Sequence, residues 1–203
     1  MTLSNSLSEP SVQPASAVTS TSFSANWNSV TGATKYYLDV STVSNFATFV
    51  VGWQNVDVNN VLTYSVNSNL SAGNTYYYRV RAANATSTSD NSNNVSVKTI
   101  PSAPVEQAAS AITASNFDAN WNASTGATGY YIDVATDNGF TSFVSGFSNR
   151  DVGNVVTYTV TGLASSTQYF YRIRAYNTGG TSSNSGTADA TTLAGGTVVA
   201  TAA

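Results

Sequence analysis

The stretch Leu70–Asn84, LSAGNTYYYRVRAAN, decides the fold of this chain. Its second half alternates: Tyr76 and every second residue after it share one side, and Arg79 and Arg81 lie on the other. A period of two is typical of a strand that buries one face. Tyr76 follows a Leu and a run of turn-type residues, where a Tyr ring can be buried at a corner between two sheets. We therefore expect the Tyr76 hydroxyl to donate a hydrogen bond to a backbone carbonyl near Leu70.

The same stretch returns near the end of the chain as Leu163–Asn177, LASSTQYFYRIRAYN, with Tyr169 in the place of the corner Tyr. A second motif, FSANWN around Trp27, returns as FDANWN around Trp121, 94 residues later. Both Trp side chains have the inward parity of an alternating strand, so we expect each of them in a core. A repeat of this length can bury a core of its own, and the chain is predicted to hold two similar domains.

Short alternating segments separated by turn residues recur through each repeat, and no helical period occurs anywhere. Seven such strands predict an all-β, antiparallel β-sandwich in each half. We predict a flexible segment at 1–9, domains at 10–100 and 101–193, and at 194–203 a tail that resembles the start of a further repeat. The linking residues 99–104, TIPSAP, carry two prolines and are expected to be stiff, which favours an elongated pair.

The composition excludes several classes of function. Charged residues are 8% of the 203-residue chain, the net charge is −3, and neither cysteine nor histidine occurs. The commonest general base, the commonest metal ligand and any thiol nucleophile are therefore missing. So few cations cannot hold a nucleic acid backbone, and no apolar run is long enough to span a membrane. We expect a non-enzymatic, extracellular protein with no metal, cofactor, nucleic acid or membrane insertion.

Charge recurs at equivalent positions of the two halves, one Asp on the third predicted strand and two Arg on the sixth. These residues are Asp39, Arg79 and Arg81 in the first half and Asp133, Arg172 and Arg174 in the second. All six point outward by parity. Opposite charges on neighbouring strands usually pair, and an exposed pair stabilises a protein by at most ~1 kcal/mol. We prefer this interpretation to the alternative, a ligand patch of acidic and basic groups.

Aromatic side chains share the outward face with the four arginines and complete the candidate ligand face. They are Tyr37, Tyr77, Tyr131, Phe170 and Tyr176. Exposed rings can form a platform for sugars or for another protein. Cross-strand packing that shields the sheet is the alternative, and we prefer it because aromatic residues are common in strands.

Two further positions are duplicated. Asp57 and Asp151 occupy equivalent positions in turn-like surroundings, where a carboxylate can cap backbone N–H groups. No spaced set of oxygen ligands surrounds either one, so a calcium site is not expected. Trp53 corresponds to Phe147, and a packed ring is expected at both positions.

Taken together, the motifs resemble the tandem fibronectin type III domains of bacterial secreted or cell-surface proteins. The matching features are Phe-x-Ala-x-Trp, Gly-Ala-Thr-x-Tyr-Tyr, the Leu-to-Tyr spacing, and Tyr-x-Tyr-Arg-Val-Arg-Ala-x-Asn; they occur within residues 10–192. The resemblance implies two immunoglobulin-like, seven-stranded sandwiches. It leaves the function open, because this fold serves as spacer, adhesin or binding module.

We therefore predict a monomeric, non-catalytic extracellular spacer or adhesion segment of a larger secreted or surface protein, whose partners are the neighbouring domains of its own chain. The alternative is a carbohydrate- or protein-binding module that uses the outward aromatics and the loops at 28–35 and 84–94. Its partner would be a polysaccharide or a surface protein. A polysaccharide-binding assay separates the two hypotheses, because a spacer should bind no polysaccharide and a binding module should bind one.

Overall fold

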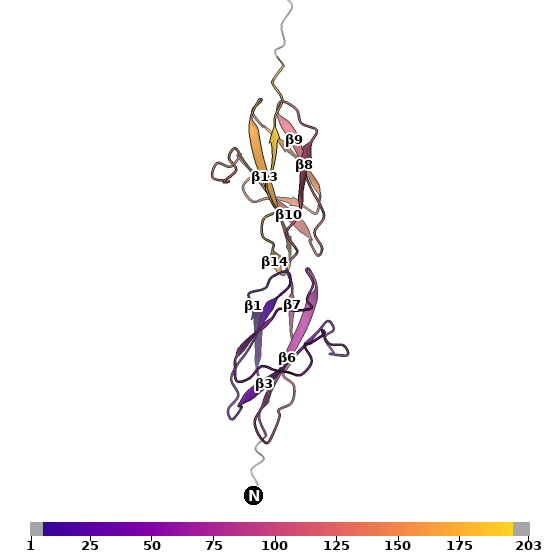
Figure 1. Ribbon diagram of the computed structural model, residues 1–203, viewed down its shortest axis with the longest axis vertical. Coiled ribbons are helices and arrows are strands. Elements are labelled where there is room, and N and C mark those ends of the chain that lie inside the picture. The colour runs from indigo at the N-terminus through magenta and orange to yellow at the C-terminus, as the bar shows by residue number, and fades with distance from the viewer. Residues whose placement is uncertain (1–5, 197–203) are drawn as a thin grey trace, which may run out of the picture. The chain divides into compact units, whose positions relative to one another are not determined.

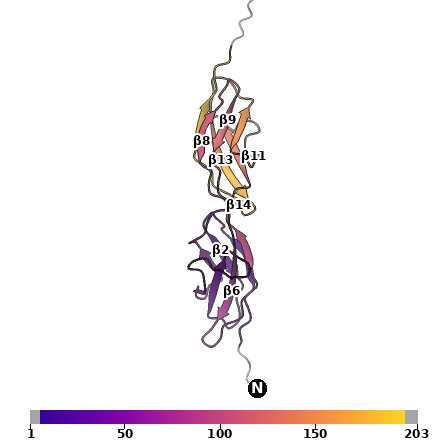
Figure 2. The same cartoon turned by 90° about the vertical axis from the view of Figure 1, so that its right-hand side faces the viewer.

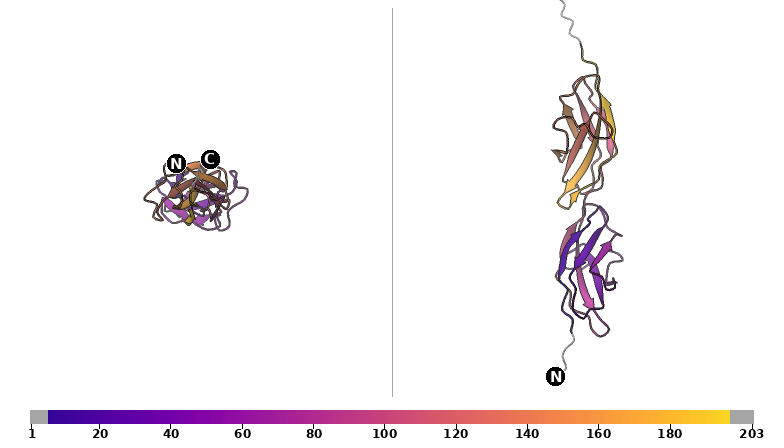
Figure 3. Two further views of the ribbon diagram at one scale, coloured as in Figure 1. Left: turned by 90° about the horizontal axis from the view of Figure 1, so that it is seen from above. Right: turned by 90° about the vertical axis from the view of Figure 1, so that its left-hand side faces the viewer.

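The structure is a computed structural model that describes residues 6–196, and within that range it contains strands and no helix. The chain divides into two compact units, with the boundary between Ile100 and Pro101 (Figure 1). Each unit consists of two antiparallel sheets packed face to face, which Figure 2 and Figure 3 show from other sides. The predicted all-β fold of two sandwiches in tandem is confirmed.

The first unit has seven strands, as the alternation predicts. They are β1 (Val12–Ser16), β2 (Phe23–Trp27), β3 (Lys35–Ser41), β4 (Val56–Asp57), β5 (Thr63–Val66), β6 (Thr75–Ala83) and β7 (Val95–Lys98). One sheet has the order β1-β2-β5 and the other β4-β3-β6-β7. Pro14 lies in the edge strand β1, where the register with β2 is interrupted between Gln13 and Ser16, so its missing N–H costs no ladder bond.

The second unit repeats this arrangement with an additional short strand. Its strands are β8 (Glu106–Ser110), β9 (Asn116–Trp121), β10 (Gly129–Ala135), β11 (Arg150–Gly153), β12 (Thr157–Thr161), β13 (Gln168–Asn177), β14 (Gly180–Thr181) and β15 (Ala188–Thr191). The sheets are β12-β9-β8 and β11-β10-β13-β14, with β15 also paired to β13. The seven predicted strands are all present, and the two-residue β14 is added to them. Gly180, at φ 136°, lets the chain fold back onto β13, whereas the first unit forms only a bridge between Ala83 and Thr88.

The two predicted core tryptophans are buried. Trp27 and Trp121 end β2 and β9, and each is 3% exposed. Their rings pack against Tyr36 and Tyr130 at centroid distances of 5.7 and 5.6 Å. Because those tyrosines belong to the opposite sheets, the aromatic pairs hold the two layers of each sandwich together.

The corner tyrosines bond as the motif predicts, but with the donor and acceptor exchanged. The backbone N–H of Ser71 donates to the Tyr76 hydroxyl at 2.8 Å, and that of Ala164 donates to Tyr169 at 2.9 Å. The expectation that the hydroxyls donate to a carbonyl is therefore wrong. The N–H groups just after the Leu of each motif have no strand partner, and a hydroxyl can accept as readily as it donates.

The N-terminal segment expected to be flexible takes part in the core where it is described. Leu7 is buried and belongs to the hydrophobic cluster of the first unit. Its side chain lies 3.5 Å from the position a Cβ on Gly32 would occupy. Residues 1–5 lie outside the described residues. So does the stretch 197–203, which makes up most of the tail that resembles a further repeat.

Candidate functional site

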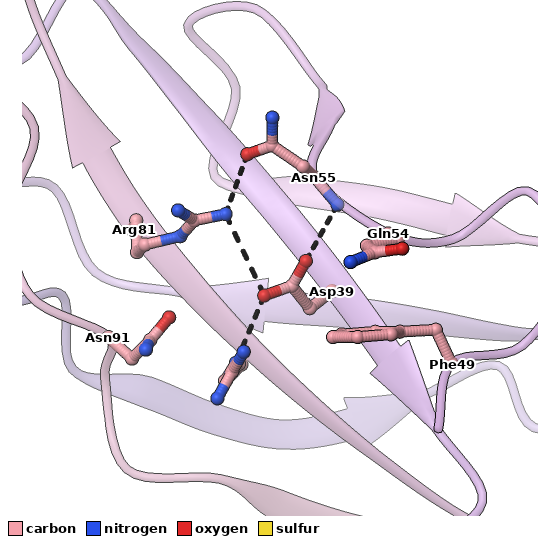
Figure 4. A pocket seen from close by; sticks show the side chains of 7 residues that line it. Asp39, Phe49, Gln54, Asn55, Arg81 and Asn91 are labelled. Carbon is pink, nitrogen blue, oxygen red and sulfur yellow. Dashed lines mark hydrogen bonds and ion pairs between the residues drawn. The ribbon is translucent and has the colours of Figure 1, made fainter. Parts of the chain in front are cut away.

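The charged cluster of the first unit is centred on Asp39, a residue of β3 that faces β6. Arg79 Nε donates to Asp39 Oδ2 at 3.0 Å, and Arg81 Nη2 lies 3.7 Å from the same oxygen. The other carboxylate oxygen accepts the backbone N–H of Asn55 at 2.6 Å (Figure 4). The predicted ion pair between neighbouring strands is thus present, and the cross-strand register aligns Asp39 with Arg79 directly.

The aspartate of the cluster is buried while its two arginines stay about a quarter exposed, which corrects the expectation of a fully exposed, screened pair. Asp39 is only 2% exposed because the segment between β3 and β4 folds over the sheet face. From this segment Phe46 stacks on the Arg79 guanidinium at 4.2 Å, and Asn55 contributes its N–H and a side-chain contact of 2.6 Å to Arg81. A buried carboxylate that loses its partners costs several times more than an exposed one.

The second unit builds the same cluster around Asp133, which is 3% exposed. Arg172 Nε donates to it at 3.0 Å, Arg174 Nη2 lies 3.3 Å from both carboxylate oxygens, and the N–H of Asn149 donates at 2.6 Å. Phe140 stacks on Arg172 at 4.1 Å. The duplication shows that the arrangement belongs to the fold of each unit.

A hollow of about 370 Å³ lies beside the cluster of the first unit (Figure 4). The lining residues come from β3, β6 and the loops that follow them: Asp39, Phe49, Gln54, Asn55, Arg79, Arg81 and Asn91. Two predicted face residues, Arg79 and Arg81, belong to this set. Four lining residues were absent from the predicted set of charges and aromatics, because they lie on irregular segments where parity gives no direction.

The predicted outward aromatics of the first unit are partly covered. Tyr37 is half-buried, with the Lys35 ammonium 4.9 Å from its ring centroid and the Arg81 guanidinium 5.8 Å from it. Lys35 also forms a salt bridge of 2.9 Å with Asp57. The Lys35 pKa is raised, first by Tyr37 and then by Asp57. Tyr77 is half-buried as well.

In the second unit the ring equivalent to that of Tyr37 is covered by a Tyr from β13 in place of a Lys. Tyr176 stacks on Tyr131 at a centroid distance of 4.7 Å, and its hydroxyl donates to Asp151 Oδ1 at 3.1 Å. Loss of hydration raises the pKa of Tyr176, and Asp151 raises it further. Phe170 is also half-buried. These contacts favour cross-strand packing for most of the predicted face, and its role in ligand binding stays a prediction.

The duplicated aspartates cap backbone groups, as the turn-like surroundings predict. Asp57 accepts the N–H of Asn59 and Asp151 accepts the N–H of Gly153, both at 2.9 Å. The hydrogen bond from Lys35, followed by the one from Asn59, lowers the Asp57 pKa. Within residues 6–196, no three acidic side chains come close enough together to hold a metal ion.

The Trp53 and Phe147 rings are buried, as expected. Each packs edge-on against a tyrosine, Tyr64 of β5 and Tyr158 of β12. The Trp53 and Phe147 rings therefore both serve packing inside their sandwiches.

The part of the chain that the structure describes holds no helix with the length and apolarity of a membrane span.

Residues 102–191 match the family model of the Fibronectin type III domain. The second unit is a fibronectin type III domain. The first unit repeats its motifs, its two-sheet order and its Asp-centred cluster, so the resemblance to tandem fibronectin type III domains is confirmed.

Two curated relatives carry matching segments. The chain is 31% identical over 189 residues to chitinase A1 of Niallia circulans, covering 85% of this chain and 24% of that protein. It is 38% identical over 96 residues to contactin-6 of Rattus norvegicus, covering 44% of this chain and 9% of that one. The chain thus spans a quarter or less of each relative. A two-domain fibronectin type III segment from chicken tenascin is 16% identical with a TM-score of 0.49, covering 91% of this chain and 99% of that one.

Each fibronectin type III domain also contains a serine pair that sequence reasoning missed. Ser89 and Ser92 lie in the segment 84–94, which was predicted as a polar loop. Their hydroxyls accept the N–H groups of Ala82 and Val80 at 3.0 and 2.9 Å, and their own N–H groups donate to the carbonyls of the same two residues. The loop is therefore fastened along β6.

The second fibronectin type III domain fastens its equivalent loop in the same way. Ser182 and Ser185 accept the N–H groups of Ala175 and Ile173, both at 3.0 Å, and donate back to the same carbonyls. The signal that reveals this pair is its recurrence at the 93-residue offset of the sixth strand. We call these four residues the serine latches.

Proposed function

We propose that the chain is a non-catalytic, extracellular spacer or adhesion segment of a larger secreted protein. The match to chitinase A1, a protein about four times longer than the matched segment, supports a role inside a multidomain chain. The same match supports a bacterial source. Its partners would be the neighbouring domains, and the segment itself would be monomeric.

The observation that carries this proposal is the self-sufficiency of each domain. Both domains have a core of their own, and in both the buried aspartate, Asp39 or Asp133, is held by contacts within the domain. A domain with a complete core of its own can fold without a partner, as a spacer requires.

Small-angle X-ray scattering tests the proposal. A compact globule of this length has a radius of gyration of about 17 Å. We expect a clearly larger value, because the linker 99–104 contains two prolines and is expected to be stiff. A value near that of the compact globule would count against a spacer, and light scattering on the same sample checks the monomeric state.

Carbohydrate binding is the second candidate, and one observation favours it. The hollow beside Asp39 combines an aromatic ring, three side-chain amides and two guanidinium groups, a composition suited to a sugar. A panel of immobilised neutral and acidic polysaccharides separates the candidates, because a pure spacer binds none of them.

A further inference from the structure

The two arginines beside the hollow of the first domain have donors that the protein does not use. Within residues 6–196, the side-chain hydrogen bonds of Arg79 run through Nε alone, and those of Arg81 run through Nη2 alone. Among the described residues, Arg81 Nε is buried without any partner. The terminal nitrogens of Arg79 thus form an open fork, the geometry that binds a carboxylate through two parallel hydrogen bonds.

The net charge of the hollow also favours the binding of a carboxylate. Its lining carries two guanidinium groups and one carboxylate, which leaves one net positive charge. Both oxygens of Asp39 already accept hydrogen bonds, one from Arg79 and one from the N–H of Asn55. An incoming anion therefore meets a carboxylate that is already hydrogen-bonded and guanidinium nitrogens that are not.

The rest of the lining suits a sugar ring. Phe49 is half-buried and forms one wall, and the amides of Gln54, Asn55 and Asn91 offer donors and acceptors for hydroxyl groups (Figure 4). A volume of about 370 Å³ lies near the small end of ligand pockets, which begin at about 300 Å³. One ring and its substituents fill such a space.

The second domain repeats the lining of the hollow except at one position. Gln54 corresponds to Ser148, whose short hydroxyl side chain has neither the reach nor the amide of a glutamine. Every other lining residue has an identical counterpart: Asp133, Phe143, Asn149, Arg172, Arg174 and Asn184. Gln54 is therefore the lining residue that distinguishes the first domain.

The second arginine of the cluster also differs between the domains. Arg174 Nη2 contacts both oxygens of Asp133 at 3.3 Å, whereas Arg81 Nη2 stays 3.7 Å from Asp39. The first domain thus holds its second arginine less tightly to the aspartate. Arg81 Nη2 instead donates to Asn55 Oδ1 at 2.6 Å, so its positive charge is less closely neutralised by the aspartate than that of Arg174.

We propose that the hollow of the first domain binds a uronate residue of an acidic polysaccharide. The carboxylate is held by the open fork of Arg79, the sugar face lies against Phe49, and Gln54 and Asn91 bond the hydroxyls. This inference rests on the carbohydrate-binding candidate above and names its substrate class. It is independent of the scattering test, which measures the separation of the domains whether or not a sugar binds.

The test is a nuclear magnetic resonance titration of the whole two-domain chain with galacturonate, and with galactose and acetate as separate probes. We expect galacturonate to shift the signals of Gln54, Asn55 and Asn91 with a dissociation constant of about 1 mM, a weak affinity suited to a shallow site. Galactose and acetate should shift them at least about tenfold more weakly. Equal shifts with acetate, or with galactose, would overturn the proposal, and so would the absence of any shift.

Two variants test the amides, with the Asn55 signal as the readout in both. Gln54→Ser gives the first domain the lining of the second, and we expect galacturonate to bind about fivefold more weakly, as the loss of one hydrogen bond predicts. Adding Asn91→Ser removes a second amide and should bring the loss to at least about tenfold. Both positions are exposed, so the fold should be retained.

The second domain supplies the matched control. Ser148→Ala combined with Asn184→Ser changes the equivalent, likewise exposed positions and should leave the Asn55 titration unchanged. Undiminished binding in the variant that lacks both Gln54 and Asn91 contradicts the assignment. An equal loss in the control contradicts it as well, because the site would then not belong to the first domain.

Discussion

Tyr176 occupies the space that a side chain on Gly129 would need: a Cβ built on that glycine would collide with the Tyr176 hydroxyl oxygen. In the first domain the two equivalent positions hold Lys35 and Ala83, so the long side chain stands on the other strand. In both domains one long side chain covers a tyrosine ring and reaches an aspartate on the neighbouring edge strand. The same contact is thus built from opposite strands.

This exchange predicts coupling between the two positions. Gly129→Lys should destabilise the second domain by about 1–3 kcal/mol, because the new side chain displaces Tyr176. Adding Tyr176→Ala to that variant recreates the pair of the first domain and should recover most of the loss. Urea unfolding of both single variants and the double variant measures the coupling. Simple additivity of the two single effects would contradict the shared space.

Because Asp39 is buried, we expect it to contribute strongly to the stability of the first domain. Asp39→Ala should destabilise the first domain by about 3–5 kcal/mol, because Arg79 and the Asn55 N–H lose their acceptor and Arg81 loses its ion-pair partner. Asp90→Ala, at an exposed aspartate of the same domain, is the control and should cost less than about 1 kcal/mol. Chemical denaturation followed by Trp fluorescence gives both values, and similar losses in the two variants would refute a buried cluster.

The hydroxyl of the corner residue Tyr76 is expected to contribute less to stability than Asp39. Tyr76→Phe leaves the Ser71 N–H without its acceptor and should lower the free energy of unfolding by about 1 kcal/mol. Tyr77→Phe serves as the comparison. It removes the hydroxyl of the next residue, and among the described residues that hydroxyl makes no hydrogen bond. Equal melting curves for Tyr76→Phe and the unaltered protein would remove the corner from the stabilising contacts.

Two tyrosines whose hydroxyls bond to the facing sheet should make both domains less stable at alkaline pH. Tyr78 and Tyr171 donate to the carbonyls of Gln13 and Gln107, and burial raises the pKa of both hydroxyls. Since the folded pKa lies above the unfolded value of about 10, their contribution is complete below about pH 10 and is lost as the pH rises through the folded value. Urea unfolding from about pH 8 to about pH 12 measures the slope. Tyr78→Phe should flatten it for the first domain, and an unchanged slope would contradict the assignment.

Alternation and duplication were enough to predict the strands of both sandwiches except β14, and the core. Trp27 and Tyr76 were placed correctly because period-two burial is a local property of a strand. The burial of Asp39 was not predictable in that way, since it depends on a long segment that folds over the sheet and brings Phe46 and Asn55 to it. The hydrogen-bond direction at Tyr76 was also wrong, because a hydroxyl donates and accepts and only its surroundings decide which.

The serine latches have a consequence for a chain built from similar repeats. Repeats that emerge one after another during synthesis are at risk of exchanging strands with a neighbour of nearly the same sequence, and an open strand edge is where such an exchange begins. Ser89 and Ser92 occupy the backbone groups of Val80 and Ala82 with a local loop of the same domain. Each domain thereby closes this part of its edge within its own sequence, so that correct folding of one repeat does not depend on the state of the next.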